Sequence, residues 1–190
     1  MSRLFLIRHG EPETGWGAGD DDPGLSQRGR AQAEAAAAAL QALAPVRIIT
    51  SPLRRCIETA APFASLTGLT PRVDAAFGEV RTPPGIADRR AWLVENFPWG
   101  AGARSRNWVE ASADLCAWRR SVIDGATALQ GDAAVFTHFI ATNVIVGAAL
   151  GSEATIVFRP GFASITELSS DNGVLSVVRL GEDMIGGEVR

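Results

Sequence analysis

Residues 4–10 read LFLIRHG, a run of four apolar side chains that leads directly into Arg8, His9 and Gly10. A short run that is apolar at every position is typical of a parallel strand buried on both faces. The next residues, 11–24, are rich in Gly, Asp and Pro and are expected to form a loop. We therefore expect a buried strand that presents Arg8 and His9 at the carboxyl edge of a sheet.

The same pattern recurs twice along the chain. Residues 133–138 read AAVFTH, so His138, the second of only two histidines, also follows an apolar strand directly. A third candidate strand, residues 46–50, leads into Ser51 and then Arg55. The carboxyl ends of parallel strands share one edge of a sheet, where ligands of open α/β folds bind.

Helix signals separate these strands. Ser26 is a candidate N-cap for a helix that ends near Pro45, and Ser51-Pro52 predicts a helix from there to about Thr67. Further helices are expected near residues 107–130 and 141–150, and a hairpin is expected around Asp171-Asn172-Gly173 between strands 163–168 and 174–180. The pattern predicts an α/β fold: a three-layer sandwich with a mostly parallel central sheet, an antiparallel element, and helices on both faces.

The chain length of 190 residues suits one domain, and we expect residues 1–190 to form a single unit. Residues 81–108 differ from the rest because they are rich in proline, arginine and tryptophan. We interpret them as a cap or insertion with one short helix near residues 87–96. The tryptophans fit a core role better than stacking on a substrate, because tryptophan buries a large apolar area.

Composition excludes several functions. The net charge is −3, which does not favour binding to nucleic acid or to an acidic membrane surface. All 18 basic residues are arginine, which excludes Schiff bases, the Walker phosphate loop and the kinase ion pair. Cys56 and Cys116 form no CxxC pair, and the longest apolar runs are too short to span a membrane. A cytoplasmic location follows as the default expectation.

Four side chains are predicted to meet at one crevice: Arg8, His9, Arg55 and His138. Two guanidiniums and two imidazoles provide bidentate donors for an anion, and a phosphoryl group matches this charge best. Each residue alone also fits an ordinary surface or loop position. The run Asp20-Asp21-Asp22 could hold a metal, but a solvated loop is the simpler interpretation.

At this point the sequence resembles a known family, the histidine phosphatase (phosphoglycerate mutase-like) superfamily. LIRHGEPE resembles its opening motif, and SPLRRCIETA resembles its second block, with Cys56 where alanine is usual. DPGLS and AVFTHF resemble two further blocks, and the likeness spans about residues 3–145 in the family's order.

The resemblance implies a role for each matching residue. His9 would be the nucleophile that becomes phosphohistidine, and Arg8, Gly10, Arg55 and His138 would bind the phosphoryl oxygens. A glutamate after the second block serves as acid in the family and maps to Glu79, with Glu11 and Glu13 as rivals closer to His9. Arg81, two residues after Glu79, and Phe139, directly after His138, are candidate substrate contacts. No metal and no cofactor are implied.

Departures from the family leave the substrate open. Mutases carry asparagine where this chain has Gly15, the second histidine is followed by Phe139 instead of glycine, and the G-x-W-E-G block is absent. We therefore expect a phosphomonoester hydrolase that acts on a small phosphorylated metabolite. The alternatives are a phosphoglycerate mutase-type transferase and a catalytically silent module that binds phosphate esters or phosphoproteins. A monomer and a homodimer both remain open.

Overall fold

A computed structural model describes residues 1–14, 22–100 and 102–184 of the chain. Its sheet has six strands in the order β3-β2-β4-β1-β5-β6. β1, β2, β3 and β4 are parallel neighbours, whereas β5 runs antiparallel to both β1 and β6. This arrangement confirms the expected mostly parallel sheet with an antiparallel hairpin. The strand bounds are Ser2–Arg8 (β1), Arg47–Thr50 (β2), Arg72–Val73 (β3), Ala133–Thr137 (β4), Ile165–Asp171 (β5) and Val174–Arg179 (β6).

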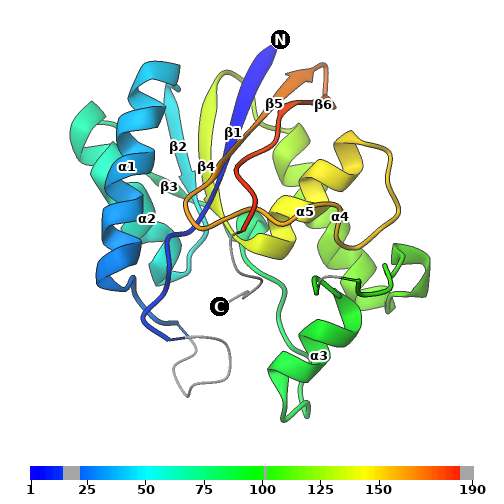
Figure 1. The fold of residues 1–190 in the computed structure, drawn as a ribbon. Coiled ribbons are helices and arrows are strands. Elements are labelled where there is room, and N and C mark those ends of the chain that lie inside the picture. The colour runs from blue at the N-terminus through cyan, green and yellow to red at the C-terminus, as the bar shows by residue number, and fades with distance from the viewer. Residues whose placement is uncertain (15–21, 101, 185–190) are drawn as a thin grey trace.

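Helices cover both faces of the sheet, as predicted (Figure 1). Side chains of β1 alternate between two apolar cores: Phe5 and Ile7 pack in the core beneath α1 and α2, and Leu4 and Leu6 pack in the core beneath α4 and α5. Burial of both sets explains why β1 is apolar at consecutive positions. The helix bounds are Gln27–Leu43 (α1), Arg54–Thr67 (α2), Arg89–Asn96 (α3), Ala113–Thr127 (α4) and Phe139–Ala149 (α5).

α1 begins where its cap predicted. The Ser26 side chain accepts a hydrogen bond from the Gly29 backbone N–H, and this satisfies one of the free donors of the first helical turn. The helix ends one residue before Ala44, close to the expected stop at Pro45.

Two predicted helices differ at their starts. Ser51 is not the N-cap of a helix, because α2 begins at Arg54 and its N-cap is Leu53. The Ser51 hydroxyl accepts a hydrogen bond from the Leu53 N–H and contacts His138. The predicted helix over 107–130 is divided. A 3-10 turn covers Trp108–Glu110, the backbone is extended at Ala111, and Ser112 caps α4.

Two glycines let the loop after β1 approach α1 at close range. A Cβ on Gly29 would lie 2.1 Å from the Glu11 carbonyl oxygen, and one on Gly10 would lie 2.6 Å from the Gly29 carbonyl oxygen. Both obstacles are backbone atoms, which cannot turn aside as a flexible side chain would. The lack of a side chain at these positions therefore fixes where the segment after His9 lies.

We expect Gly29→Ala to lower the free energy of unfolding by about 1–3 kcal/mol, the usual cost of forcing atoms into a packed site. Gly100→Ala is the matched control, because among the described residues its new Cβ would meet only the Ala103 Cβ, at 3.8 Å. Urea denaturation of both variants measures the change. Equal midpoints for Gly29→Ala and the wild type would contradict the close packing.

Candidate active site

Three neighbouring strands bring polar side chains to one edge of the sheet. Arg8, the last residue of β1, pairs with Thr137 of β4, and the His9 N–H donates to the Thr137 carbonyl at 2.9 Å. The Ser51 N–H, just beyond β2, donates to Phe136 at 2.9 Å. This register places the His9 and His138 rings 5.2 Å apart between centroids.

His9 is buried, with 2% of its surface exposed, and its orientation is fixed by one hydrogen bond. Its Nδ1 lies 2.8 Å from the Gly10 carbonyl oxygen. A carbonyl only accepts, so Nδ1 carries the proton and Nε2 keeps its lone pair. Burial, together with the charges of Arg55 and Arg8, holds the pKa of His9 well below its ordinary value. The neutral ring therefore offers Nε2 as a nucleophile.

Arg8 is buried with unused donors. Its Nη1 donates to the Pro160 carbonyl at 2.9 Å, whereas Nε and Nη2 have no partner among the described residues. The guanidinium lies over the rings of Phe162 at 3.9 Å and Phe139 at 5.1 Å. Burial lowers the pKa of Arg8 to about 9, and the Arg55 charge contributes in the same direction. Two buried donor nitrogens without an acceptor in the described part of the chain suit an anionic ligand.

Arg55 lies in the first turn of α2, where only 5% of its surface is exposed. One of its terminal nitrogens is 3.7 Å from an Asp22 carboxylate oxygen. The Thr59 hydroxyl links this helix to the loop after β1, because it donates to the Arg55 carbonyl and accepts from the Gly10 N–H at 3.0 Å. Arg55 and His9 are thus held in one framework.

Glu79 is buried, and its carboxyl lies against the first turn of α5. Its two carboxyl oxygens accept from the backbone N–H groups of Val80 and Ile140, both at 3.1 Å. Burial raises the pKa of Glu79, although these hydrogen bonds and the charges of Arg55 and Arg89 oppose the rise. A carboxyl with a raised pKa can carry a proton nearer neutral pH than an ordinary glutamate can.

His138 caps α5 and is fully buried. Its Nε2 lies 2.7 Å from the Ser51 hydroxyl oxygen and 3.4 Å from the Cys56 sulfur. Burial and the charge of Arg55 hold the pKa of His138 well below its ordinary value. The site therefore contains two neutral imidazoles beside two arginines.

The remaining predicted residues lie in different settings. Phe139, expected as a substrate contact, has no exposed surface, and its ring lies beside the Arg8 guanidinium. His138 is the N-cap of α5 with extended backbone and Phe139 is the first helical residue, so the two side chains leave the chain in different directions. Arg81 is exposed, outside the buried cluster. Gly15, Asp20 and Asp21 lie outside the described residues.

The structure adds residues that sequence reasoning missed. Ser51 follows a strand directly, as His9 and His138 do. This position in the sequence could have identified Ser51 as a site residue. Arg89 of α3 donates to the Val80 carbonyl at 3.0 Å and to the Thr82 hydroxyl, next to Glu79. Its contact depends on folding of the 81–108 segment, so no local pattern predicts it.

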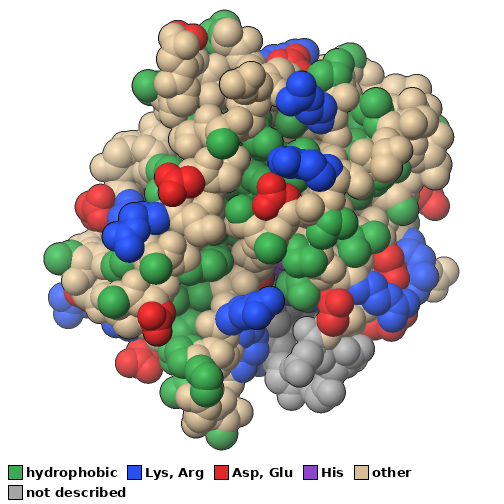
Figure 2. Space-filling model, turned by 180° about the vertical axis from the view of Figure 1, so that it is seen from behind, with side chains coloured by type: hydrophobic (Ala, Val, Ile, Leu, Met, Phe, Trp, Pro, Cys, Tyr) green, Lys and Arg blue, Asp and Glu red, His purple; other side chains and the backbone are tan. Residues whose placement is uncertain are grey.

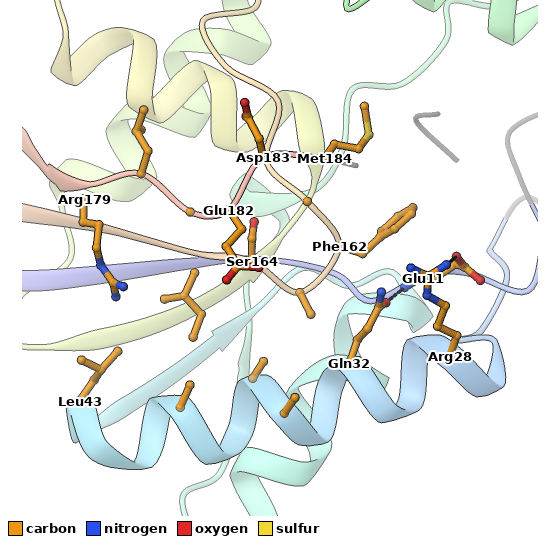
Figure 3. A pocket seen from close by; sticks show the side chains of 18 residues that line it. Glu11, Arg28, Gln32, Leu43, Phe162, Ser164, Arg179, Glu182, Asp183 and Met184 are labelled. Carbon is orange, nitrogen blue, oxygen red and sulfur yellow. Dashed lines mark hydrogen bonds and ion pairs between the residues drawn. The ribbon is translucent and has the colours of Figure 1, made fainter. Parts of the chain in front are cut away.

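A groove of about 780 Å³ lies next to the buried cluster, between α1 and residues 161–165 and 179–184 (Figure 3). Phe162 and Met184 line it and also contact Arg8, so they form the wall between groove and cluster. Ala36, Ala39 and Leu43 supply an apolar floor from α1.

The chain is similar to proteins of one known family. The sequence profile of the histidine phosphatase superfamily (branch 1) matches residues 4–183. Glucosyl-3-phosphoglycerate phosphatase of Mycobacterium tuberculosis is 41% identical over 80 residues, which are 40% of this chain and 36% of that protein. The counterpart from Mycolicibacterium vanbaalenii is 38% identical over 82 residues, 42% of this chain and 36% of that protein. The matched region thus spans little more than a third of these curated relatives.

Solved structures extend the likeness to the whole fold. A mycobacterial glucosyl-3-phosphoglycerate phosphatase solved with VO3 superposes with a TM-score of 0.73 at 26% identity, covering 96% of this chain and 100% of that one. A putative α-ribazole-5′-P phosphatase from Escherichia coli gives a TM-score of 0.74 at 20% identity, covering 98% and 99%. The second likeness shows the fold alone. Together with the profile match, these comparisons confirm the resemblance found in the sequence.

The unpaired donors of Arg8 predict anion binding. Inorganic phosphate should raise the melting temperature of the wild type, because a ligand that binds only the folded state stabilises it. Arg8→Met should weaken phosphate binding by about a hundredfold or more, since two charge-assisted hydrogen bonds are worth about 1.5–3 kcal/mol each. Arg90→Met, at an exposed position of α3, is the control. Equal phosphate-induced shifts in both variants would show that Arg8 is not the anion's partner.

Proposed function

The chain belongs to the histidine phosphatase superfamily (branch 1), and from this premise we propose that it hydrolyses small phosphomonoesters through a phosphohistidine on His9. The observation that carries the proposal is the neutral His9 ring with Nε2 free, beside an arginine with two buried nitrogens that have no partner among the described residues. A phosphoryl group would supply the missing acceptors and place its phosphorus within reach of Nε2.

The first step would transfer the phosphoryl group to His9. Nε2 donates its electron pair to phosphorus as the bond to the ester oxygen breaks, and the departing oxygen takes the proton of Glu79. Arg8, Arg55 and His138 would stabilise the charge on the equatorial oxygens. The guanidiniums supply the positive charge that metal ions provide in other phosphoryl-transfer sites, so the proposed route needs no metal or cofactor.

The second step would release phosphate. Glu79, now ionised, takes a proton from water as the water oxygen bonds to phosphorus and the bond to Nε2 breaks. The products are an alcohol, inorganic phosphate and neutral His9. The raised pKa of Glu79 supports both roles, because such a carboxyl exchanges its proton at a pH closer to neutrality.

The substrate class is proposed from the named relatives. Glucosyl-3-phosphoglycerate phosphatases act on a phosphorylated metabolite, as their name states, and a small phosphomonoester of this general kind fits the proposed chemistry. We further propose a cytoplasmic enzyme without a nucleic-acid or membrane partner, either a monomer or a homodimer. Figure 2 supports the absence of a nucleic-acid partner, because acidic and basic side chains are interspersed on the face shown. No described helix is long and apolar enough to cross a bilayer.

We propose that residues 81–108 act as a cap on a single domain formed by residues 1–190. The segment starts two residues after Glu79. Its Arg89 donates hydrogen bonds to Val80 and Thr82, so part of α3 lies next to Glu79. Its tryptophans serve the core: Trp99 and Trp108 are 8% and 3% exposed. Polar contacts to the substrate beyond its phosphate would then come from the arginines of this segment, including the exposed Arg81.

The nucleophile has a direct test. A working reaction quenched with denaturant should yield one phosphoryl group per chain, and the adduct should be labile to acid and stable to base. His9→Ala should lose both the adduct and turnover while its unfolding midpoint stays near that of the wild type. An acid-stable adduct, or full activity in His9→Ala, would contradict the assignment.

The same preparation distinguishes the alternatives. We expect release of inorganic phosphate with negligible interconversion of 2- and 3-phosphoglycerate, because Gly15 offers no donor where mutases have asparagine. Efficient interconversion with little free phosphate would favour the mutase. Phosphate binding without turnover of any ester in a metabolite panel would favour the silent binding module.

The role of Glu79 predicts a pH effect. Its pKa is raised in the folded protein, so the protonated form, which would act as acid, is lost as pH rises through that pKa. Because the folded state binds this proton more tightly than the unfolded state does, Glu79 contributes to the free energy of unfolding at low pH. That contribution is lost as pH rises through the raised pKa of Glu79. Glu79→Gln should slow hydrolysis of alkyl phosphates by about 10²-fold or more and remove this alkaline limb.

Aryl phosphates serve as the control for Glu79, because their leaving groups need less protonation. Their phosphorylation step should be slowed much less in Glu79→Gln. Equal loss on alkyl and aryl esters in pre-steady-state measurements would argue for a structural role of Glu79.

A further inference from the structure

Ser51 is a buried polar residue that the proposed steps do not use. It follows β2, has no exposed surface, and is held by its N–H to the Phe136 carbonyl at 2.9 Å. Its hydroxyl oxygen lies 2.7 Å from His138 Nε2, the shortest polar contact that the structure gives the His138 ring. A contact this short between two fully buried groups constrains both of them.

The protons around Ser51 can be assigned in turn. The Leu53 N–H donates to the hydroxyl oxygen at 3.3 Å. The Cys56 thiol donates to the Thr137 carbonyl at 3.4 Å, which leaves its sulfur only as a weak acceptor. The imidazole nitrogen is therefore the strongest acceptor within reach of the Ser51 hydroxyl proton.

We propose that Ser51 is a positioning residue for His138: its hydroxyl donates to Nε2, which places the single proton of the neutral ring on Nδ1 and fixes the ring plane. The consequence for catalysis rests on the proposed function. In this tautomer Nδ1–H remains as a donor for a phosphoryl oxygen.

The opposite tautomer fits less well. If Nε2–H donated to Ser51, the neutral ring would have no second N–H to offer an anion. The Ser51 hydroxyl would then keep only the Cys56 sulfur, its other side-chain partner, as an acceptor. A lone pair on Nδ1 would repel phosphoryl oxygens, whereas an N–H attracts them. Burial keeps the ring neutral, as the lowered pKa of His138 indicates, so the choice of tautomer matters.

Nitrogen-15 NMR can read the tautomer directly, because the chain contains only two histidines. Long-range proton–nitrogen correlations of histidine-labelled protein separate protonated from unprotonated ring nitrogens, and His9→Gln assigns the signals. We expect both wild-type rings as Nδ1–H tautomers. An Nε2–H tautomer at His138 would overturn the proposal. This measurement needs no turnover, so it decides the proposal even if the chain hydrolyses no ester.

Ser51→Ala removes the donor and should shift His138 toward a mixture of tautomers. On a phosphomonoester substrate, kcat/KM should fall about tenfold, the scale for loss of one hydrogen bond. Ser51→Thr keeps the hydroxyl and should restore the Nδ1–H tautomer and most of the activity. Unchanged tautomer and kcat/KM in Ser51→Ala would overturn the proposal.

Cys56→Ala is the matched control. It removes a sulfur that lies 3.4 Å from the same His138 nitrogen, and it leaves the Ser51 hydroxyl in place. We expect its tautomer to match the wild type and its kcat/KM to stay within about twofold. A tautomer that changes in Cys56→Ala and not in Ser51→Ala would assign the positioning role to the thiol and overturn the proposal. Melting curves of the three variants identify any general loss of folding.

Discussion

Burial of positive charge at one edge of the sheet governs the rest of the site. Arg8 and Arg55 are 1% and 5% exposed, and Glu79 is a buried carboxylate close enough to act on Arg8 electrostatically. Isolated ions are costly to bury, and neighbouring groups respond by shifting their protonation. Both histidines are accordingly held neutral. A dianionic phosphoryl group would offset the excess charge, so the site is electrostatically suited to the ligand that the proposed reaction requires.

Two aromatic rings stabilise the buried charge of Arg8. The Arg8 guanidinium lies 3.9 Å from the Phe162 ring centroid and 5.1 Å from that of Phe139, and both rings attract a cation without occupying its N–H groups. A carboxylate in either position would pair with the arginine and compete with phosphate. The apolar neighbours therefore stabilise the cation and keep two of its donors for a ligand.

Backbone hydrogen bonds fix the positions of the site residues. Strand register aligns the ends of β1, β2 and β4, so that His9 and Ser51 are each tied by a main-chain hydrogen bond to β4. Glu79 is held by two backbone N–H groups, one of them from the first turn of α5. Side chains that approach from separate segments are thus attached to the most buried part of the fold, where positional freedom is smallest.

The amino-acid sequence was sufficient to predict a mostly parallel sheet and to place four polar side chains at one edge of it, namely Arg8, His9, Arg55 and His138. Apolar runs at Leu4–Ile7 and Ala133–Thr137 predicted buried strands because burial on both faces leaves a purely local mark. A polar residue directly after such a strand must lie at the sheet edge, so Arg8, His9 and His138 could be placed without coordinates. Ser26 likewise marked the start of α1, because capping involves neighbours in sequence.

Tertiary contacts decided the rest. Adjacency to His138 suggested a substrate contact at Phe139, yet core packing buries that ring against Arg8. Ser51 has the sequence context of a helix cap, but its hydroxyl contacts a histidine 87 positions away. Arg89 and Phe162 reach the site from segments whose local sequences do not indicate which side chain makes the contact. Such contacts depend on which distant segments pack together, and packing free energy is a property of the whole core, which no local pattern encodes.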